Sequence, residues 1–495
     1  MDRQSSRIHS AATCLTRSCA LIGLSLLAAL IAGCASGASS GTGSPVAGDT
    51  GVVVLASSTA NDQLAQLDMT VSSLTLTSQS GKTVTVFSTP QTAEYTYLNG
   101  NVEPLTYATI PQDVYTAATA SVGQVNAACV TQDPATGGLL VNFALSEPSV
   151  PASAVTVNLP NPLTINASST ALVLDLQVSK SLALPNCYEN AANPIAYTPT
   201  FSLVPLTVSS QPTNSSNGKA TGLRGLIAAV NENGTSFTVT GADGPTWQVA
   251  SNNSTVFQGV TGATQLAAGM PVDMDVAIQA DGAPLLATRV AIYDANPSTL
   301  TMASGPMIQI ANSQSTLSAL VDEYEGPIEY GLGGGPEFGF GNATFQVSDQ
   351  LTNVQSLPFP ASFSAANMVN GQNVFITTHA AATSNSPIYV PTTTMTLLPQ
   401  TINGTVTAVS TSGSFTTYTV TLAPYNLFAD LAFQLGQTTP LTNPNTIVVY
   451  ADSNTQTLNS TPVSAGNVFR FYGLVFNDSG TLRMDSAQVN DGVTE

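Results

Sequence analysis

The chain has 495 residues, enough for several domains at roughly 100 to 200 residues each. Charged residues make up only 8% of it, and Thr, Ser, Asn, Gly, Val and Ala dominate, a composition that favours strands over salt-bridged helices. The 10 Lys and Arg residues stand against 29 Asp and Glu, a formal net charge of -19. This balance argues against nucleic acid as a partner and against electrostatic binding to anionic lipid.

Residues 1–33 are predicted to be a secretory signal peptide. Arginines precede an apolar stretch over residues 21–32 that is too short to span a bilayer as a mature helix. The end of this stretch, Ile31-Ala-Gly-Cys34, resembles the lipobox of bacterial lipoproteins. The resemblance implies that Cys34 is lipidated and anchors the mature chain by its acyl chains. Ala35, in place of Asp, resembles the pattern sorted to the outer membrane of a Gram-negative envelope. The alternative is an ordinary signal peptide with an incidental cysteine.

Residues 34–50 are rich in Ser, Gly and Thr without an apolar period, so we expect a flexible tether. Two cysteines remain beyond it, Cys129 and Cys187. In an exported protein such a pair predicts a disulfide, whose loop of about 59 residues contributes roughly 4 kcal/mol on the chain-entropy model. The alternative is two unpaired thiols buried in a core.

Residues 51–210 contain short, β-branched, alternating segments separated by Pro and Gly, which predict a β-sandwich. Several of these segments resemble the family named domain of unknown function 4382, found in bacterial lipoproteins. The similar segments are Gly51-Val-Val-Val-Leu55, Leu98-Asn-Gly100 with Leu105, Ile110-Pro-Gln-Asp-Val-Tyr115 and Thr170-Ala-Leu-Val-Leu-Asp-Leu176.

A polar linker over residues 211–219 is followed by an internal repeat in three copies, at 220–296, 297–400 and 401–495. The copies begin at Gly225-Leu-Ile-Ala-Ala-Val230, Gly305-Pro-Met-Ile-Gln-Ile310 and Gly404-Thr-Val-Thr-Ala-Val409. Each copy ends on a glycine followed 16 or 17 residues later by an apolar residue: Gly269 with Leu286, Gly371 with Ile388, and Gly466 with Leu482. We expect the middle strand of the second copy at Thr344-Phe-Gln-Val347.

A repeat of this length suits a small barrel of about five strands. The copies resemble the family named domain of unknown function 5666, whose members are compact barrels likened to the OB-fold. Insertions interrupt the second copy at 325–342 and the third at 423–445. The predicted fold class is therefore all-β, a β-sandwich followed by three small OB-like barrels.

A cluster of acids and aromatics at the first insertion is the candidate binding loop. Its acids, aromatics and glycines suit a saccharide cleft, an oxygen-ligated calcium ion or a partner surface. The alternative is a hairpin tip whose aromatics fold back onto the barrel. The candidate residues are Asp322, Glu323, Tyr324, Glu325, Glu329, Tyr330, Glu337, Phe338 and Phe340.

Other residues point to structural roles. His379, the last histidine of the mature chain, is expected to be a satisfied or solvent-facing strand residue and not a general base. Asp273 and Asp275 share one strand face, which could form a cation site but more commonly is a solvated face that blocks edge pairing. Trp247 is expected in a barrel core or mouth. We predict no catalytic residues, no metal site and no cofactor.

Three functions remain open from these residues. The first is a membrane-anchored envelope lipoprotein that binds or scaffolds polysaccharide or a protein partner without catalysis, at the periplasmic face or the cell surface. The second is a hydrolase of extracellular or envelope glycans, which needs two carboxylates in one cleft. The third is a passive structural spacer, which predicts no pocket.

Overall fold

The computed structural model describes residues 48–59, 61, 63–132, 139–145, 153–182, 197–242, 244–297, 301–311, 315–319, 323–325, 337–349, 356–379, 389–423, 426–432, 439–458 and 461–491. For 131–132, 139–145, 281, 301, 309–311, 323–325 and 491 it describes the backbone alone. The predicted signal peptide, Cys34, most of the tether and Cys187 lie outside these residues. Within them, no helix has the length and apolarity needed to cross a membrane.

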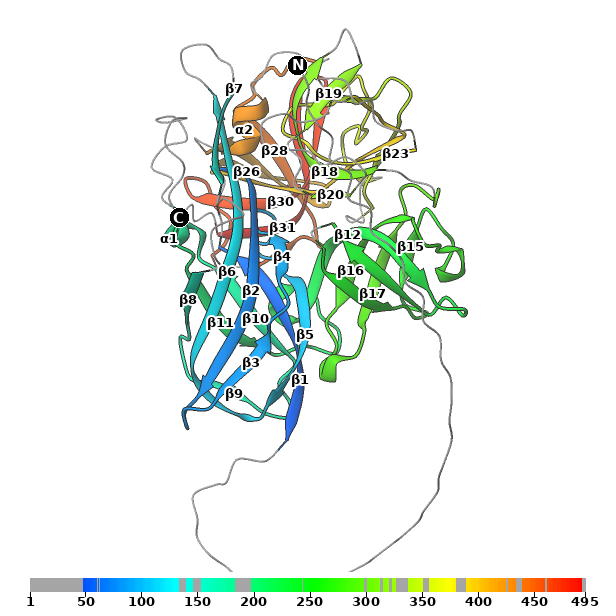
Figure 1. Ribbon diagram of the computed structural model, residues 1–495. Coiled ribbons are helices and arrows are strands. Elements are labelled where there is room, and N and C mark those ends of the chain that lie inside the picture. The colour runs from blue at the N-terminus through cyan, green and yellow to red at the C-terminus, as the bar shows by residue number, and fades with distance from the viewer. Residues whose placement is uncertain are drawn as a thin grey trace, which may run out of the picture. The chain divides into compact units, whose positions relative to one another are not determined.

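The described chain is nearly all strand, which confirms the all-β fold class, and its strands form four sheets (Figure 1). In the first sheet the main path runs β3-β2-β6-β8-β11-β10-β1-β5, and β3 also packs beside β5. The N-terminal layers are therefore one continuous sheet that rolls around its core. The strands are β1 (Asp49–Ser58), β2 (Leu64–Ser78), β3 (Thr83–Phe87), β4 (Gln91–Glu94), β5 (Glu103–Pro111), β6 (Asp113–Gln132), β7 (Leu139–Leu145), β8 (Ser153–Asn158), β9 (Leu163–Ile165), β10 (Ala171–Leu176) and β11 (Phe201–Leu206), with a short helix α1 (Val178–Ser181).

Strand β2 shows how the sequence produces this curvature. Leu67, Met69 and Val71 alternate into the core, but the buried set then shifts by one residue to Leu74 and Leu76. The pairing of β2 with β6 changes register between Val71 and Ser73. Such a bulge bends a strand and increases its twist, so one strand of 15 residues serves a rolled sheet.

The second sheet, barrel 1, follows the order β14-β13-β12-β16-β17-β15 and closes because β14 also pairs with β17 in parallel. Counted along the chain without β15, this is the strand order 1-2-3-5-4 that returns to strand 1, as expected for an OB-like barrel. The elements are η1 (Ser215–Asn217), β12 (Lys219–Val230), β13 (Ser236–Gly241), β14 (Thr246–Ala250), β15 (Val256–Gln258), η2 (Ala263–Gln265), β16 (Pro271–Ala277), η3 (Ala280–Gly282) and β17 (Leu285–Ala291).

Barrel 3 repeats the order of barrel 1 as β28-β27-β26-β30-β31-β29, again closed by a parallel pair, β28 with β31. Its elements are β26 (Gln400–Ser412), β27 (Phe415–Leu422), α2 (Leu427–Ala432), β28 (Thr446–Ala451), β29 (Gln456–Thr457), β30 (Val468–Asp478) and β31 (Thr481–Asp491).

In barrel 2 the last strand is divided into two pieces, β24 and β25. β24 pairs with β21 at one end of the sheet path, and β25 pairs with β22 and β23 at the other. Because these pieces are neighbours along the chain, the path returns on itself. The elements are β18 (Thr301–Ala311), β19 (Thr316–Ala319), β20 (Glu323–Glu325), β21 (Glu337–Gly339), β22 (Thr344–Val347), β23 (Asn373–Thr378), β24 (Tyr389–Pro391) and β25 (Thr394–Leu397).

One glycine turn recurs in all three barrels. Gly269, Gly371 and Gly466 have φ angles of 89°, 90° and 90°, a left-handed conformation that favours glycine. Each N–H donates to a carbonyl of the first strand of its barrel, at 2.7, 2.6 and 2.8 Å (Ile227, Met307 and Val406). The three predicted copies therefore share this turn.

Two details of the predicted repeat alignment are wrong. Residues Thr344–Val347 do not form the second strand of barrel 2, because β22 pairs in parallel with β25, as β15 does with β17 in barrel 1. The second strand is β19, which pairs with β18. Leu482 is not the counterpart of Leu286, since Ala250 faces Leu286 across β14 and β17, and Asp485 occupies that register in barrel 3. A tight hairpin between β30 and β31 replaces the longer η3 connection of barrel 1.

The insertion of the third copy contributes a helix that contacts the first sheet. Leu431 of α2 is fully buried in a cluster with Ala65 of β2 and Val130 of β6. Figure 1 shows α2 beside the upper part of the long strand β6. The insertion therefore joins barrel 3 to the N-terminal sheet.

Candidate functional site

Two adjoining pockets lie where the N-terminal sheet meets the barrels. The first, the arginine pocket, has a volume of about 160 Å³ and is lined by Arg224 and Arg470 with no carboxylate. The second, the aspartate pocket, has about 170 Å³ and is lined by acids and Lys219. We call the two together the junction cleft. The residues that line both pockets are Gly100, Asn101, Thr221, Tyr472 and Gln488.

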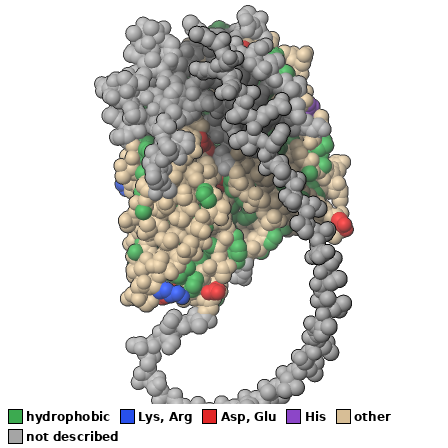
Figure 2. All heavy atoms as spheres, in the orientation of Figure 1, with side chains coloured by type: hydrophobic (Ala, Val, Ile, Leu, Met, Phe, Trp, Pro, Cys, Tyr) green, Lys and Arg blue, Asp and Glu red, His purple; other side chains and the backbone are tan. Residues whose placement is uncertain are grey.

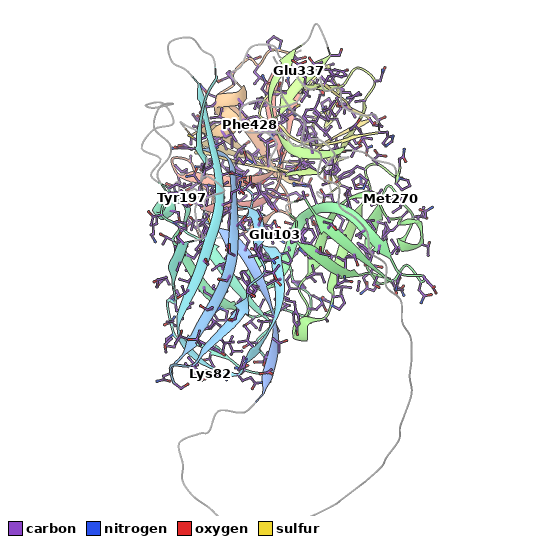
Figure 3. All side chains as sticks on the ribbon, viewed as in Figure 1. Lys82, Glu103, Tyr197, Met270, Glu337 and Phe428 are labelled. Atoms are coloured by element: carbon purple, nitrogen blue, oxygen red, sulfur yellow. The ribbon has the colours of Figure 1, made fainter. Side chains whose placement is uncertain are left out.

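The arginine pocket is rich in neutral polar side chains. Amides from the N-terminal sheet are Asn61, Asn99 and Asn101, and amides from barrels 2 and 3 are Asn373, Gln400, Asn426, Gln488 and Asn490. Tyr97, Tyr472 and Phe428 add aromatic rings; Figure 3 labels Phe428 on α2. On the face seen in Figure 2, charged side chains are few among the described residues. The pocket offers hydrogen bonds and ring faces beside the guanidinium groups of Arg224 and Arg470.

Asn101 fixes the wall that the two pockets share. Its Nδ2 donates to the Thr221 carbonyl at 2.7 Å, and its Oδ1 accepts from the Thr221 N–H at 3.0 Å. The side chain thus pairs with the backbone of β12 as a neighbouring strand would. Just beyond, Gly222 has a φ of 67° at a break in the β12–β16 register, and its N–H donates to Asp275.

A buried ion network stands behind this wall. Asp273 is fully buried, Asp275 is 5% exposed, and Arg289 between them is 7% exposed. The Arg289 guanidinium contacts the Asp273 carboxylate, and it reaches Asp275 at 3.4 Å and Asp349 at 3.1 Å. Burial acts to lower the pKa of Arg289, but Asp273 and its neighbouring carboxylates raise it well above its usual range. The network holds barrel 1 against the first residues beyond β22.

The predictions for Asp273 and Asp275 are therefore wrong. Their common strand face is neither solvated nor an open cation site, because the outer side of β16 is covered and the carboxylates face arginines. An alternating strand pattern shows which residues share a face, but not whether another part of the chain covers that face.

The equivalent face of barrel 3 meets this network with different side chains. The register places Arg470, Tyr472 and Gln488 where barrel 1 has Asp273, Asp275 and Arg289. Burial raises the pKa of Tyr472, and the nearby guanidinium of Arg224 acts in the opposite direction. Asp275 and Tyr472 line the same pocket, so the two faces lie close together. The junction cleft is thus built between related surfaces that carry different chemistry.

Each pocket contains one buried oxygen without a hydrogen-bond partner among the described residues. In the arginine pocket it is Oδ1 of Asn373, and in the aspartate pocket it is Oδ2 of Asp485, a residue only 6% exposed. Burial, followed by the charge of Asp452, raises the pKa of Asp485 to about 6. Leaving such a group unsatisfied costs roughly 1–3 kcal/mol, so each oxygen requires a donor from beyond the described residues.

The predicted binding loop does not contribute to this cleft. Phe338 and Phe340 are buried in the core of barrel 2, as in the alternative of aromatics that fold back, and Glu337 is half-buried on β21. None of these three lines either pocket. Glu323, Tyr324 and Glu325 are described by backbone alone on β20, and Asp322, Glu329 and Tyr330 lie outside the described residues. A binding role for the loop stays a prediction.

The expectation of a barrel core or mouth position for Trp247 is confirmed, whereas the expectation that His379 is not a general base stays a prediction. His379 follows β23 with its side chain 31% exposed, and its Nε2 and Nδ1 lie 2.5 Å from Asp294 and 3.1 Å from Asn296. Trp247 is 5% exposed in the core of barrel 1, and its Nε1 donates to the Pro104 carbonyl at 2.7 Å.

Only one of the two cysteines of the predicted disulfide belongs to the described chain. Cys129 is fully buried on β6, and Cys187 lies outside the described residues. The disulfide stays a prediction.

We did not predict the residues of the junction cleft from the sequence, although the distribution of basic residues pointed to them. Beyond residue 33 the sequence has seven Lys and Arg residues, and four of them belong to the cleft or the network behind it: Lys219, Arg224, Arg289 and Arg470. This grouping of basic residues, in a chain with so few charged residues, indicates a functional site.

Within the described part of the chain, no three His, Cys, Asp or Glu side chains are grouped to hold a metal ion. The resemblances to domains of unknown function 4382 and 5666 stay predictions. No protein-family model and no curated protein matches this chain.

Proposed function

We propose that this chain is a non-enzymatic binding module of the bacterial envelope, held to the membrane by a lipid on Cys34, whose junction cleft takes a sugar unit of a polysaccharide. The arginine pocket supports the ligand class. A 150 Å³ cavity accommodates a benzene ring, so 160 Å³ suits one six-membered ring. Amides and tyrosines match the hydroxyl edges of a sugar, and aromatic rings match its apolar face.

The single observation that carries the proposal is the side-chain amide oxygen Oδ1 of Asn373. It is buried in the pocket wall without a partner among the described residues, while the backbone N–H of the same residue is satisfied by Gln400 at 2.8 Å. A ligand hydroxyl that donates to this oxygen would satisfy it. Because an unsatisfied buried oxygen lowers the stability of the fold, we infer that Asn373 serves binding and not folding.

The passive spacer is the weaker hypothesis, because it predicts no pocket, and the described chain contains two. A protein partner remains compatible with the cleft only if it inserts one narrow polar group, since each pocket has the volume of about one ring.

A glycan array tests the proposal. We expect the mature chain to bind a restricted set of glycans, and Asn373→Ala and Gln488→Ala to weaken that binding at least tenfold. Asn253→Ala is the matched control, since Asn253 is an exposed amide outside both pockets. Equal binding by all three variants would place the sugar elsewhere, and no binding by the parent chain would reject the ligand class.

The predicted loop needs its own arm in that experiment. Deleting residues 325–342 would remove β21 and the buried Phe338 and Phe340. Replacing only residues 326–336 with a Gly-Ser linker spares β20 and β21. If that variant loses glycan binding while Asn373→Ala retains it, the loop and not the cleft is the site.

A carboxylate hydrolase is the second candidate, and the Asp485–Asp452 pair favours it. A carboxyl group with a pKa near 6 beside a second acid can act as a general acid at neutral pH. Release of reducing ends from a polysaccharide recognised on the array would detect the activity. If such release occurs and Asp485→Asn abolishes it, the protein is an enzyme and the non-enzymatic proposal fails.

The anchor is tested separately. Cys34→Ala is expected to move the mature chain from the detergent phase to the aqueous phase in Triton X-114 partitioning, because the acyl chains supply the membrane affinity. Protease added to intact cells that express a tag at Glu495 then distinguishes surface display from a periplasmic position. A Cys34→Ala chain that still partitions with detergent would exclude lipidation as the anchor.

A further inference from the structure

One carboxylate of the aspartate pocket has an oxygen without a hydrogen-bond partner among the described residues. Asp275, Asp452, Asp485 and Lys219 line it. Asp275 lies 3.8 Å from Lys219 and 3.4 Å from Arg289, so its charge is compensated. Asp485 is only 6% exposed, and its Oδ2 has no hydrogen-bond partner among the described residues. A buried carboxylate normally has a cation or several donors around it.

The fold does not need a carboxylate at this position. In barrel 1 the same register is occupied by Leu286, which pairs with β14 as Asp485 pairs with β28. A barrel of this type therefore closes equally well with an apolar side chain there.

The turn that carries Asp452 leads to the same conclusion. In barrel 1 the corresponding residue is Asn252, and its Oδ1 accepts from the N–H two residues later at 2.8 Å, as Asp452 does. In both barrels a threonine in this turn donates to the last strand at 2.7 Å. A neutral amide forms the same turn in barrel 1, so the turn does not require the charge of Asp452.

We propose that the aspartate pocket binds an organic ammonium group, which donates to the Asp485 carboxylate and is further stabilised by the charge of Asp452. An ammonium group supplies a positively charged hydrogen-bond donor, which Oδ2 of Asp485 lacks among the described residues. A bare divalent metal fits less well, because the described side chains contain no group of three metal-ligating residues. The inference does not depend on sugar binding in the arginine pocket.

The shared wall indicates where the rest of the ligand lies. Tyr472 and Gln488 line both pockets, so an amine held by Asp485 would direct its substituent toward the arginine pocket. An amino sugar and a lysyl side chain both present such an amine. The two sources differ in the group that bears the amine, which is a polar ring in the sugar and an aliphatic chain in lysine.

The affinity is expected to depend on pH. Asp485 faces Asp452, Lys219, Asp275 and Tyr472 in this pocket. Since burial and Asp452 bring its pKa to about 6, its carboxylate is ionised at pH 7.5 and mostly protonated at pH 5, whereas an alkylammonium stays charged at both values. Binding should therefore be about tenfold weaker at pH 5, in proportion to the ionised fraction.

An NMR titration of the mature chain tests the proposal, with propylammonium as probe and 1-propanol as its neutral counterpart. We expect propylammonium to bind at pH 7.5, about tenfold more weakly at pH 5, and propanol not to bind. Asp485→Asn and Asp485→Leu should each lose propylammonium binding at least tenfold. Asp49→Asn, an exposed acid outside the pocket, should keep it.

Further arms separate the possible outcomes. Methyl glucosaminide against N-acetyl-lysine methylamide shows which amine source binds more tightly, and either result supports the proposal. Equal binding of propanol, retained binding in both Asp485 variants, or displacement of propylammonium by equimolar calcium chloride would overturn it. Asn253→Ala, at an exposed amide outside both pockets, should leave propylammonium binding unchanged. Because the ammonium titration uses no glycan, a failed glycan experiment and a failed ammonium experiment can be told apart.

Discussion

Asp485→Asn should make the protein more stable at neutral pH and leave its stability unchanged in acid. The folded protein holds the pKa of this carboxyl at about 6, against an ordinary value of 3.8, because burial and Asp452 disfavour the charged form. A difference of about two pH units corresponds to about 3 kcal/mol at 1.36 kcal/mol per unit. The neutral, nearly isosteric amide avoids that cost.

The sign follows from proton binding. Below pH 4 the carboxyl is protonated in both states, so it contributes no pH-dependent difference. Between pH 4 and pH 6 the folded state retains a proton that the unfolded state has released, and stability falls as the pH rises. Above pH 6 the full destabilisation is present. The advantage of Asp485→Asn should therefore grow from near zero at pH 3.5 to about 3 kcal/mol at pH 7.5.

Urea unfolding followed by circular dichroism measures this difference at a series of pH values, with Asp49→Asn as the control. The control should show no comparable pH-dependent difference, because Asp49 is exposed at the start of β1. A gap between Asp485→Asn and the parent that stays constant from pH 4 to pH 7.5, or a less stable variant at pH 7.5, would refute the reasoning. Addition of propylammonium at pH 7.5 should narrow the gap, since a ligand that binds only the folded parent stabilises it.

Three further predictions concern stability. Gly466→Ala should lower the free energy of unfolding by about 1–2 kcal/mol, the penalty of a left-handed residue. Gly269→Ala should lower it clearly more, because Gly269 has nearly the same φ but an added Cβ would lie 2.3 Å from a backbone carbonyl oxygen. Equal losses in urea unfolding would contradict this. Cys187→Ser should remove the predicted disulfide and lower the free energy of unfolding by roughly 4 kcal/mol under oxidising conditions. Under reducing conditions it should have no such effect, and a free-thiol assay checks the disulfide directly. Trp247→Phe should cost about 1–3 kcal/mol, because the carbonyl of Pro104 loses its indole donor, and a thermally neutral variant would rule that contact out.

Local patterns predicted the elements of the fold that depend on neighbours along the chain. Period-two alternation located the strands, and the glycine turns at Gly269, Gly371 and Gly466 located the repeats, because their left-handed backbone needs the same residue each time. The alignment failed where loops differ in length. In barrel 2 the insertion moved the matching Thr344–Val347 segment to another strand position.

The candidate site could not be predicted because it depends on what covers the outside of each barrel. The repeated sequence pattern predicts the core that each copy encloses. In barrel 1, Val272, Met274 and Val276 are buried in that core. The intervening Asp273 and Asp275 read as solvated because such positions usually are. Asp275 lines a pocket with Tyr472 of barrel 3, and Arg289 pairs with Asp349 from barrel 2. These segments are connected by no local pattern.

The substitution of Arg470 and Tyr472 for Asp273 and Asp275 affects how the copies can associate. If every copy carried the same residues on this face, each barrel could meet any other, in the same chain or in another molecule, and head-to-tail contacts of that kind extend into fibres. Because the two faces differ, a contact between barrel 1 and barrel 3 is not equivalent to a contact between two copies of barrel 1. The divergence of the copies thus makes the contact between barrel 1 and barrel 3 specific to these two faces.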